Sequence, residues 1–270
     1  MANSQPRPQE TWDDGAAYEQ YVGRWSRRVA APFVQQLAVP AGARWLDVGS
    51  GSGALSEAVL AAAGPAELLG IDRSAAYVAL LRRRLDAPRA HFAVGDARRL
   101  PLPAGACDAV VSGLVLNFVP QPAEAVTEMA RVVRPGGTVA VYLWDYAGEM
   151  QFMRHFWDAA VALDPAAAIL DEGSRFPICR PDPLAALLRA AGLADVVVWP
   201  IDVATPFRDF DDYWRPFLSG QGPAPGYVAA LVAPRRAALR ERLRATLPTA
   251  PDGSVSLIAR AWAARGRPVG

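Results

Sequence analysis

Residues 45–53 read Trp45-Leu46-Asp47-Val48-Gly49-Ser50-Gly51-Ser52-Gly53, an apolar strand that runs into three closely spaced glycines. A side chain at any of these glycines would stand between the backbone and a molecule lying across the turn, so the pattern predicts close approach of a ligand to the main chain. A helix is expected over residues 54–63, and its first N–H groups would point at the same place. The alternative is a glycine-rich turn needed only for tight packing.

Strands and helices alternate regularly after this turn. The expected strands are 44–48, 67–71, 90–94, 109–112 and 137–143, and the expected helices between them are 54–63, 74–85 and 122–133. This alternation predicts an α/β fold with a doubly wound, mostly parallel sheet. A helix at 29–37, with apolar residues at helical spacing, is expected to pack against that sheet.

The pattern changes after Trp144. Helices are expected at 150–163, 183–191 and 227–247, strands at 196–200 and 253–263, and an aromatic-rich loop around 207–214. We therefore predict N-terminal cap helices in residues 1–40 and one domain over 41–270. Two insertions, at about 146–192 and 205–250, would form a lid over the ligand.

The composition limits the classes of function. Of the 270 residues, 52% are hydrophobic and 20% are charged, as in a globular protein, and the net charge of +1 provides no field to attract nucleic acid or an anionic membrane. Cys107 and Cys179 match no metal or redox spacing, so both are expected to be buried in a reducing compartment. Residues 1–14 lack the apolar core of a signal peptide, and no run has the length of a membrane span. A cytoplasmic protein with a small-molecule partner and without a metal is expected, of undefined oligomeric state.

Acidic residues stand at the ends of the next two strands. Asp72 follows the second strand and Asp96 follows the third. A carboxylate at the first of these places can accept hydrogen bonds from ribose hydroxyls, and one at the second can accept from an adenine amine. Each carboxylate could instead cap the helix that follows it. Three neighbouring strand ends with a Gly-rich turn, Asp and Asp favour a nucleoside-like ligand.

Four motifs together resemble one enzyme family. They are Leu46–Gly53, Gly70-Ile71-Asp72, Gly95-Asp96-Ala97 with Leu100-Pro101-Leu102-Pro103 and Cys107–Val110, and Glu128–Gly137. Residues 44–145 with these motifs resemble the core of class I S-adenosylmethionine-dependent methyltransferases, in the small-molecule, ubiquinone/menaquinone-type (methyltransferase type 11-like) branch. The resemblance implies a Rossmann-like seven-stranded sheet whose last strand lies antiparallel beside the strand at Val196. It also implies S-adenosyl-L-methionine as cofactor.

The resemblance implies roles for single residues. Asp47 and the glycines would surround the amino-acid part of the cofactor, Asp72 would bind the ribose, and Arg24 would pair with the carboxylate. Residues 18–26 could alternatively form a surface helix whose aromatic side chains pack on the sheet. The expected cofactor-binding set is Tyr21, Arg24, Trp25, Asp47, Gly49, Ser50, Gly51, Gly53, Asp72, Arg73, Asp96, Ala97, Ser112, Gly113 and Leu114.

The acceptor side is less defined by the sequence. Methyl transfer to an O, N or C nucleophile proceeds with or without a general base, depending on the acceptor, and only two histidines are present, His91 and His155. His91 lies inside a strand and is expected in the core, so His155 is the candidate catalytic residue. The expected pocket walls are Trp144, Tyr146, Phe156 and Trp214, which suit a planar or hydrophobic acceptor.

Two other functions are compatible with parts of this pattern. A nicotinamide-dependent oxidoreductase would have Gly-x-Gly-x-x-Gly, whereas this chain has Gly-x-Gly-x-Gly preceded by Asp47, and it has no lysine for a Tyr-x-x-x-Lys pair. A protein that binds S-adenosylmethionine without transferring a methyl group would carry the same motifs. RNA or protein as the acceptor is disfavoured because there is no basic appendage.

Overall fold

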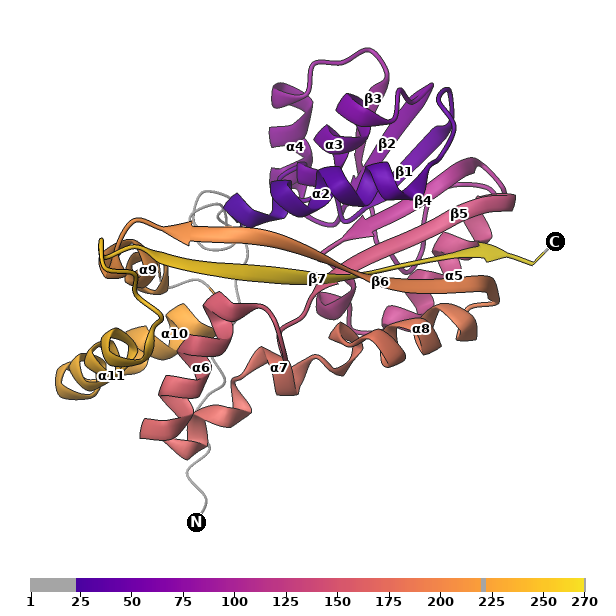
Figure 1. Ribbon diagram of the computed structural model, residues 1–270. Coiled ribbons are helices and arrows are strands. Elements are labelled where there is room, and N and C mark those ends of the chain that lie inside the picture. The colour runs from indigo at the N-terminus through magenta and orange to yellow at the C-terminus, as the bar shows by residue number, and fades with distance from the viewer. Residues whose placement is uncertain (1–22, 220–221, 270) are drawn as a thin grey trace. The chain divides into compact units, whose positions relative to one another are not determined.

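The computed structural model describes residues 23–219 and 222–269, and these form two compact units (Figure 1). The helical unit contains Arg24, Tyr146–Arg175 and most of Ala204–Ile258. The sheet unit contains Trp25–Asp145, Phe176–Val203 and the described residues from Ala259 onward. Residues 176–192, which the sequence analysis placed in the first insertion, belong to the sheet unit.

A seven-stranded sheet organises the fold, in the order β3-β2-β1-β4-β5-β7-β6. Its strands are β1 (Arg44–Val48), β2 (Glu67–Asp72), β3 (Ala90–Val94), β4 (Cys107–Gly113), β5 (Val133–Trp144), β6 (Leu193–Phe207) and β7 (Val255–Pro268). Strands β1 to β5 pair in parallel, and β7 runs antiparallel to β5. The predicted doubly wound, mostly parallel seven-stranded sheet is confirmed, including the antiparallel last strand between β5 and β6.

Apolar runs explain why the central strands are parallel and buried. Ala109, Val110 and Val111 of β4 and Val139, Ala140 and Val141 of β5 have no exposed surface. Strands covered by helices on both faces require such continuous runs. Because Asp47 pairs with Val111 and Gly113 with Tyr142, the carboxyl ends of β1, β4 and β5 meet at one edge of the sheet, here called the carboxyl edge.

The helices of the sheet unit bury one apolar stripe each. They are α2 (Arg24–Leu37), α3 (Ala54–Ala62), α4 (Ala75–Arg84), α5 (Pro122–Val132) and α8 (Pro181–Ala190), with short turns η2 (Leu116–Phe118) and η4 (Pro177–Cys179). Phe33 of α2 packs on Tyr142 of β5, with ring centroids 4.7 Å apart. Helices α5 and α8 lie side by side, as Figure 1 also shows.

The helical unit is built around aromatic rings. Its elements are α6 (Gln151–Leu163), η3 (Pro165–Ile169), α7 (Glu172–Arg175), α9 (Phe210–Trp214), η5 (Arg215–Leu218), α10 (Pro223–Ala230) and α11 (Ala233–Thr246). Phe152 and Phe156 of α6 stack on Phe217 at 4.5 and 4.4 Å between ring centroids. Such a cluster provides a hydrophobic core for a unit made of short helices.

Three predicted elements differ from the structure. The helix expected at 227–247 is wrong, because Val232 is extended and Pro234 lies in the first turn of α11, where its ring and missing N–H prevent continuation from α10. The strand expected at 196–200 is longer than predicted, since β6 spans Leu193–Phe207. The segment expected to be a loop at 207–214 contains the helix α9. His91 is exposed and not in the core, because β3 is the outermost strand and His91 lies on its open face.

Both cysteines are buried, as expected. Burial raises the pKa of Cys107 to about 11 and raises the pKa of Cys179 as well. Among the residues that the structure describes, no helix is long and apolar enough to span a bilayer.

Candidate functional site

The glycine-rich turn after β1 is held by the end of β2. The backbone N–H groups of Gly49 and Ser50 both donate to the carbonyl oxygen of Ile71, at 2.7 and 3.1 Å. Gly49, Gly51 and Gly53 have φ angles of +78°, +48° and +90°, a region that side chains rarely adopt. Gly53 is the N-cap of α3 and supplies no side-chain hydrogen bond there, so the positive end of the helix lacks a side-chain cap.

The three glycines are required for different reasons. A β-carbon at Gly49 would lie 2.5 Å from both methyl groups of Val115, and one at Gly53 would lie 2.4 Å from the side chain of Leu81. A β-carbon at Gly51 would meet no heavy atom closer than the Gly49 carbonyl oxygen at 3.9 Å. Packing therefore explains Gly49 and Gly53, whereas no packing contact requires glycine at Gly51, where close approach of a ligand stays a prediction.

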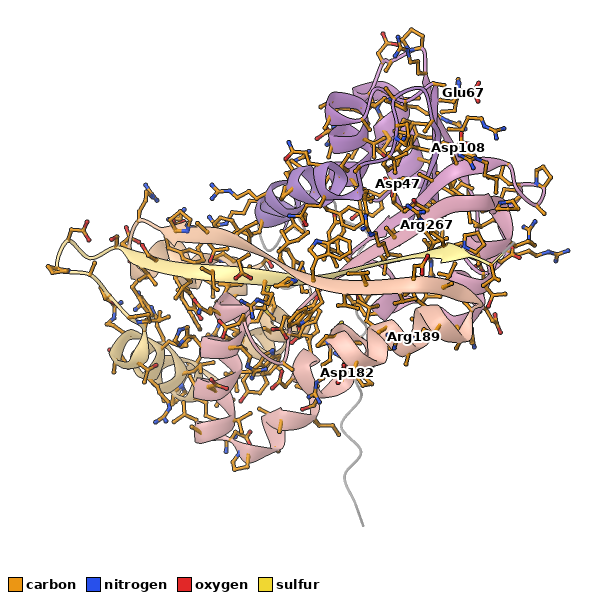
Figure 2. All side chains as sticks on the ribbon, turned by 45° about the vertical axis from the view of Figure 1, so that its right-hand side comes forward. Asp47, Glu67, Asp108, Asp182, Arg189 and Arg267 are labelled. Atoms are coloured by element: carbon orange, nitrogen blue, oxygen red, sulfur yellow. The ribbon has the colours of Figure 1, made fainter. Side chains whose placement is uncertain are left out.

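Asp47, two residues before the first glycine of this turn, is a fully buried carboxyl group (labelled in Figure 2). The Ser56 hydroxyl donates to its Oδ2 at 2.6 Å, while its Oδ1 has no hydrogen-bond partner within the described chain. Burial raises the pKa of Asp47 to about 7, although the hydrogen bond from Ser56 acts in the opposite direction and lowers this pKa. Ser50 Oγ is likewise buried and has no described partner. A cationic group that donates a hydrogen bond to Asp47 Oδ1 would supply the partner that this buried oxygen lacks in the described chain.

Asp72 links the end of β2 to the turn. Its Oδ2 accepts from the N–H of Gly51 at 2.8 Å, and its Oδ1 accepts from the N–H of Ser74 at 2.8 Å. The N-cap of α4 is Ser74, whose hydroxyl accepts from the Tyr77 N–H. The helix-cap role considered for Asp72 is thus filled by Ser74, and each carboxylate oxygen of Asp72 keeps a lone pair for a further donor.

Asp96 is placed differently from Asp47 and Asp72. It is exposed, and Arg98 donates to both of its oxygens, from Nε at 3.1 and 3.2 Å and from Nη2 at 2.7 Å. These hydrogen bonds lower the pKa of Asp96 to about 2. Ala97 is half-buried and Arg73 is exposed. An adenine contact from Asp96 would have to share the carboxylate with Arg98.

The segment after β4 packs closely on the turn and on β5. Ser112 Oγ donates to the Val48 carbonyl at 2.7 Å. A β-carbon at Gly113 would lie 2.4 Å from the Tyr142 hydroxyl, so glycine is needed there for packing. Leu114 has a φ of +62°, and its N–H donates to the Tyr142 carbonyl at 2.8 Å. The positive φ is strain, which surrounding contacts must offset.

The expected acceptor residues are divided between the two units. Trp144 ends β5 in the sheet unit, whereas Tyr146, Phe156 and Trp214 belong to the helical unit. Phe156 has no exposed surface and stacks on Phe217, and Trp214 lies 6.0 Å from the same ring. Phe156 and Trp214 are thus part of that unit's aromatic core.

His155 lies on α6 of the helical unit and is half-buried. Burial lowers its pKa, so the neutral imidazole predominates at pH 7.

Three residues of the expected cofactor-binding set, Tyr21, Arg24 and Trp25, come from the N-terminal segment. Tyr21 lies outside the described residues. Arg24 belongs to the helical unit, where its guanidinium lies 3.7 Å from the Asp212 carboxylate and 4.8 Å from the centre of the Phe207 ring. Trp25 is buried in the sheet unit.

Sequence reasoning missed three residues of this region. Ser56 binds Asp47, Val115 fills the space beside Gly49, and Asn117 of η2 carries a buried amide nitrogen without a partner in the described chain. Ser56 could have been found from the sequence, since it lies one turn into the helix that follows the glycines. Val115 and Asn117 carry no local signal.

The arrangement at the carboxyl edge agrees with comparisons to known proteins. Residues 46–141 match a family described as a methyltransferase domain. A demethylmenaquinone methyltransferase of Roseiflexus sp. is 31% identical over 185 residues, which cover 63% of this chain and 76% of that protein. The chain belongs to the class I S-adenosylmethionine-dependent methyltransferases.

The chain is also similar to two further methyltransferases. A 2-methyl-6-phytyl-1,4-hydroquinone methyltransferase of Synechocystis sp. is 31% identical over 188 residues, or 68% of this chain, and the alignment spans 57% of that relative's length. A phosphoethanolamine N-methyltransferase of Haemonchus contortus, solved with S-adenosylhomocysteine, has the same fold at a TM-score of 0.57 and 16% identity, covering 94% of this chain and 57% of the other.

The turn of this methyltransferase fits the family's cofactor. Asp47 Oδ1 is a buried acceptor without a described partner, which suits an ammonium group. The uncapped N-terminus of α3 suits a carboxylate, and Gly51 leaves its β-carbon direction open for a ligand. Asp72 has the chemistry to accept hydrogen bonds from two ribose hydroxyls.

Proposed function

We propose that this chain transfers a methyl group from S-adenosylmethionine to a small-molecule acceptor. When bound, the cofactor supplies an electrophilic methyl group on a sulfonium sulfur. The observation that carries the proposal is Asp47 Oδ1, a buried acceptor that has no partner in the described chain and lies just before a turn that is open at Gly51. The chain's own residues would bind and orient the cofactor, with Asp47 and Ser50 toward the amino acid and Asp72 toward the ribose.

The acceptor class follows from chemistry and from the relatives. Two of the reported relatives are named for hydroquinone or demethylmenaquinone substrates. We propose a ring-bearing small molecule with oxygen substituents as the first acceptor class to test. His155, whose pKa is lowered by burial, is our candidate for the base that takes the proton lost by the acceptor. A full kcat in His155→Gln with the identified acceptor would remove His155 from that role.

Cofactor binding is tested with S-adenosylhomocysteine. Saturating ligand should raise the melting temperature, because a ligand that binds the native state stabilises it by mass action. Asp72→Ala should weaken binding roughly tenfold to a hundredfold, the range for losing hydrogen bonds to a charged group. Calorimetric titration measures both affinities.

The matched control is Asp108→Ala. Asp108 lies at the amino end of β4, where it accepts from the Arg44 N–H at 2.8 Å and pairs with Arg134. Asp108 and Glu67 lie on the strands to either side of Arg44, the first residue of β1, whereas Asp47 lies three residues further along that strand; all but Arg44 are labelled in Figure 2. This variant should bind S-adenosylhomocysteine normally. Unchanged affinity in Asp72→Ala would remove Asp72 from the ribose contact.

Methyl transfer itself needs a separate assay. Incubation with methyl-labelled S-adenosylmethionine and a panel of hydroxylated aromatic compounds should give a labelled product. Cofactor binding without a labelled product across a broad panel would instead favour a binding protein that transfers no methyl group. The nicotinamide alternative has no support, since the reported relatives are methyltransferases.

A further inference from the structure

Among the described residues of the sheet unit, four buried polar atoms along the carboxyl edge have no hydrogen-bond partner. On the β1 side these are Asp47 Oδ1 and Ser50 Oγ, which the proposed cofactor site uses. On the β4 and β5 side they are the amide nitrogen of Asn117 and the indole nitrogen of Trp144. Buried donors normally have acceptors, so these two N–H groups call for an explanation of their own.

Trp144 stands at the end of β5. Its side chain is 1% exposed, and its Nε1–H meets no acceptor in the described chain. Trp144 follows Tyr142 by two residues and therefore shares its face of the sheet. The Tyr142 hydroxyl fills the space beside Gly113, the last residue of β4. Trp144 is thus the next side chain on this face beyond the end of β4.

Asn117 stands on η2, four residues after the end of β4. The next residue, Phe118, packs edge-on against Phe176 with ring centroids 5.4 Å apart. The Leu114 N–H is tied to the Tyr142 carbonyl at 2.8 Å, which holds the start of this segment against β5. Asn117 thus lies on the segment that follows β4, and Trp144 lies at the end of the neighbouring strand β5.

Other tryptophans of the sheet unit serve as a comparison. Trp45 and Trp199 also have indole N–H groups without described partners. Trp45 is the second residue of β1, at the amino half of the strand, and Trp199 lies on β6 and stacks on Phe33 at 6.4 Å. Only the position of Trp144 coincides with the edge where β4 and β5 end. Trp45 is therefore the matched control.

We infer that Trp144 Nε1–H and the Asn117 amide donate hydrogen bonds to an oxygen of the methyl acceptor. Two neutral donors without partners are suited to a carbonyl, hydroxyl or phenolate oxygen on a ring, and they would select such molecules over hydrocarbon rings of the same shape. Asn117 and Trp144 are thus specificity-determining residues. The inference rests on the proposed function, since it names the acceptor chemistry of that same site.

Nuclear magnetic resonance of the tryptophan indoles tests the contact directly. The chain has 8 tryptophans, so its ¹⁵N-indole spectrum is simple, and Trp144→Phe and Trp45→Phe assign the two relevant signals. The protein saturated with S-adenosylhomocysteine is titrated with 1-naphthol and, separately, with naphthalene, which lacks the hydroxyl group. The Trp144 signal should move downfield with 1-naphthol alone, and the Trp45 signal should not move.

Variant affinities provide the second measurement. Trp144→Phe and Asn117→Leu should each weaken 1-naphthol binding about fivefold to tenfold, the loss expected for one neutral hydrogen bond. Trp45→Phe should leave it unchanged. S-adenosylhomocysteine affinity should be normal in all three. Trp144→Phe should lower the melting temperature of the free protein about as much as Trp45→Phe does, because each replaces an indole that is only 1% exposed by a smaller ring.

The outcomes separate this inference from the proposed function. If S-adenosylhomocysteine binds but 1-naphthol leaves the Trp144 signal unchanged, or moves it no more than naphthalene does, the inference is overturned while the cofactor assignment stands. Equal losses in Trp144→Phe and Trp45→Phe would also overturn it. Failure of S-adenosylhomocysteine to stabilise the protein would overturn the proposed function first.

Discussion

At the scale of single residues, glycines that look equivalent in the sequence perform different tasks. Gly49 and Gly51 both have positive φ angles, but a β-carbon would strike Val115 at the first position and would face open space at the second. The first glycine thus serves packing and the second leaves room for a ligand.

Gly49→Ala and Gly51→Ala should therefore have separable effects. Gly51→Ala should cost about 1–2 kcal/mol of stability from the positive φ, and it should weaken S-adenosylhomocysteine binding. Gly49→Ala should cost roughly 2–5 kcal/mol, because overpacking against Val115 adds to that strain. Urea unfolding measures the first effect and calorimetry the second. Val115→Ala should partly rescue Gly49→Ala and should not rescue Gly51→Ala; rescue of both would refute the distinction.

At the scale of elements, one arginine ties the start of the helical unit to α7. Arg154 of α6 donates to the Tyr146 carbonyl at 2.9 Å and to both oxygens of Asp171 at 2.8 Å. The Asp171 Oδ1 also accepts from the Gly173 N–H at 2.9 Å. The side chains of Arg154 and Asp171 are only 17% and 13% exposed, so water screens this pair little.

Arg154→Ala should destabilise the protein by about 3 kcal/mol, because it leaves a largely buried carboxylate without its partner. Arg240→Ala is the matched control, since Arg240 pairs with Asp211 at 2.8 Å while the two side chains are 39% and 64% exposed. That variant should change stability by less than about 1 kcal/mol. Equal losses in the two variants, measured by urea unfolding at pH 7, would contradict the importance of burial here.

At the scale of the whole molecule, each unit contains one buried carboxyl group whose pKa is raised by burial. The pKa of Asp47 in the sheet unit rises to about 7, and that of Glu172 in the helical unit rises to about 8. The Trp157 indole N–H donates to Glu172. Between the unfolded and the folded pKa these two groups hold more protons in the native state, so their contribution to stability is greatest at acid pH and falls as pH rises.

The contribution of these two groups to the free energy of unfolding should fall by several kcal/mol between about pH 4 and pH 8. Asp47→Asn should remove the decrease in the free energy of unfolding that occurs up to about pH 7. Glu172→Gln should remove the decrease that occurs up to about pH 8. Unfolding measured at half-unit pH steps on the wild type and both variants tests this. Parallel curves for all three proteins would show that neither group is held neutral by the fold.

The local pattern predicted most of the sheet unit because its signals are short-range. The run Trp45–Gly53, the apolar strands and the acidic residues at strand ends define a parallel sheet with a ligand edge. The prediction of a single helix at 227–247 was wrong because the sequence pattern continues across Pro234. The ring of this proline clashes with the backbone carbonyl one turn earlier and so interrupts the helix. The prediction that His91 lies in the core was wrong because the apolar pattern of a strand does not reveal whether that strand is the outermost one of the sheet.

The sequence by itself determined the fold, the family and the end of the sheet where the cofactor is expected. These follow from the spacing of glycines, aspartates and apolar residues along the chain, which is a local property. Only the tertiary structure decided which glycine faces open space, and which buried atoms, such as Asp47 Oδ1 and Trp144 Nε1, lack a partner in the described chain. Whether a polar atom is satisfied depends on every group packed around it, and those groups come from strands far apart in the sequence.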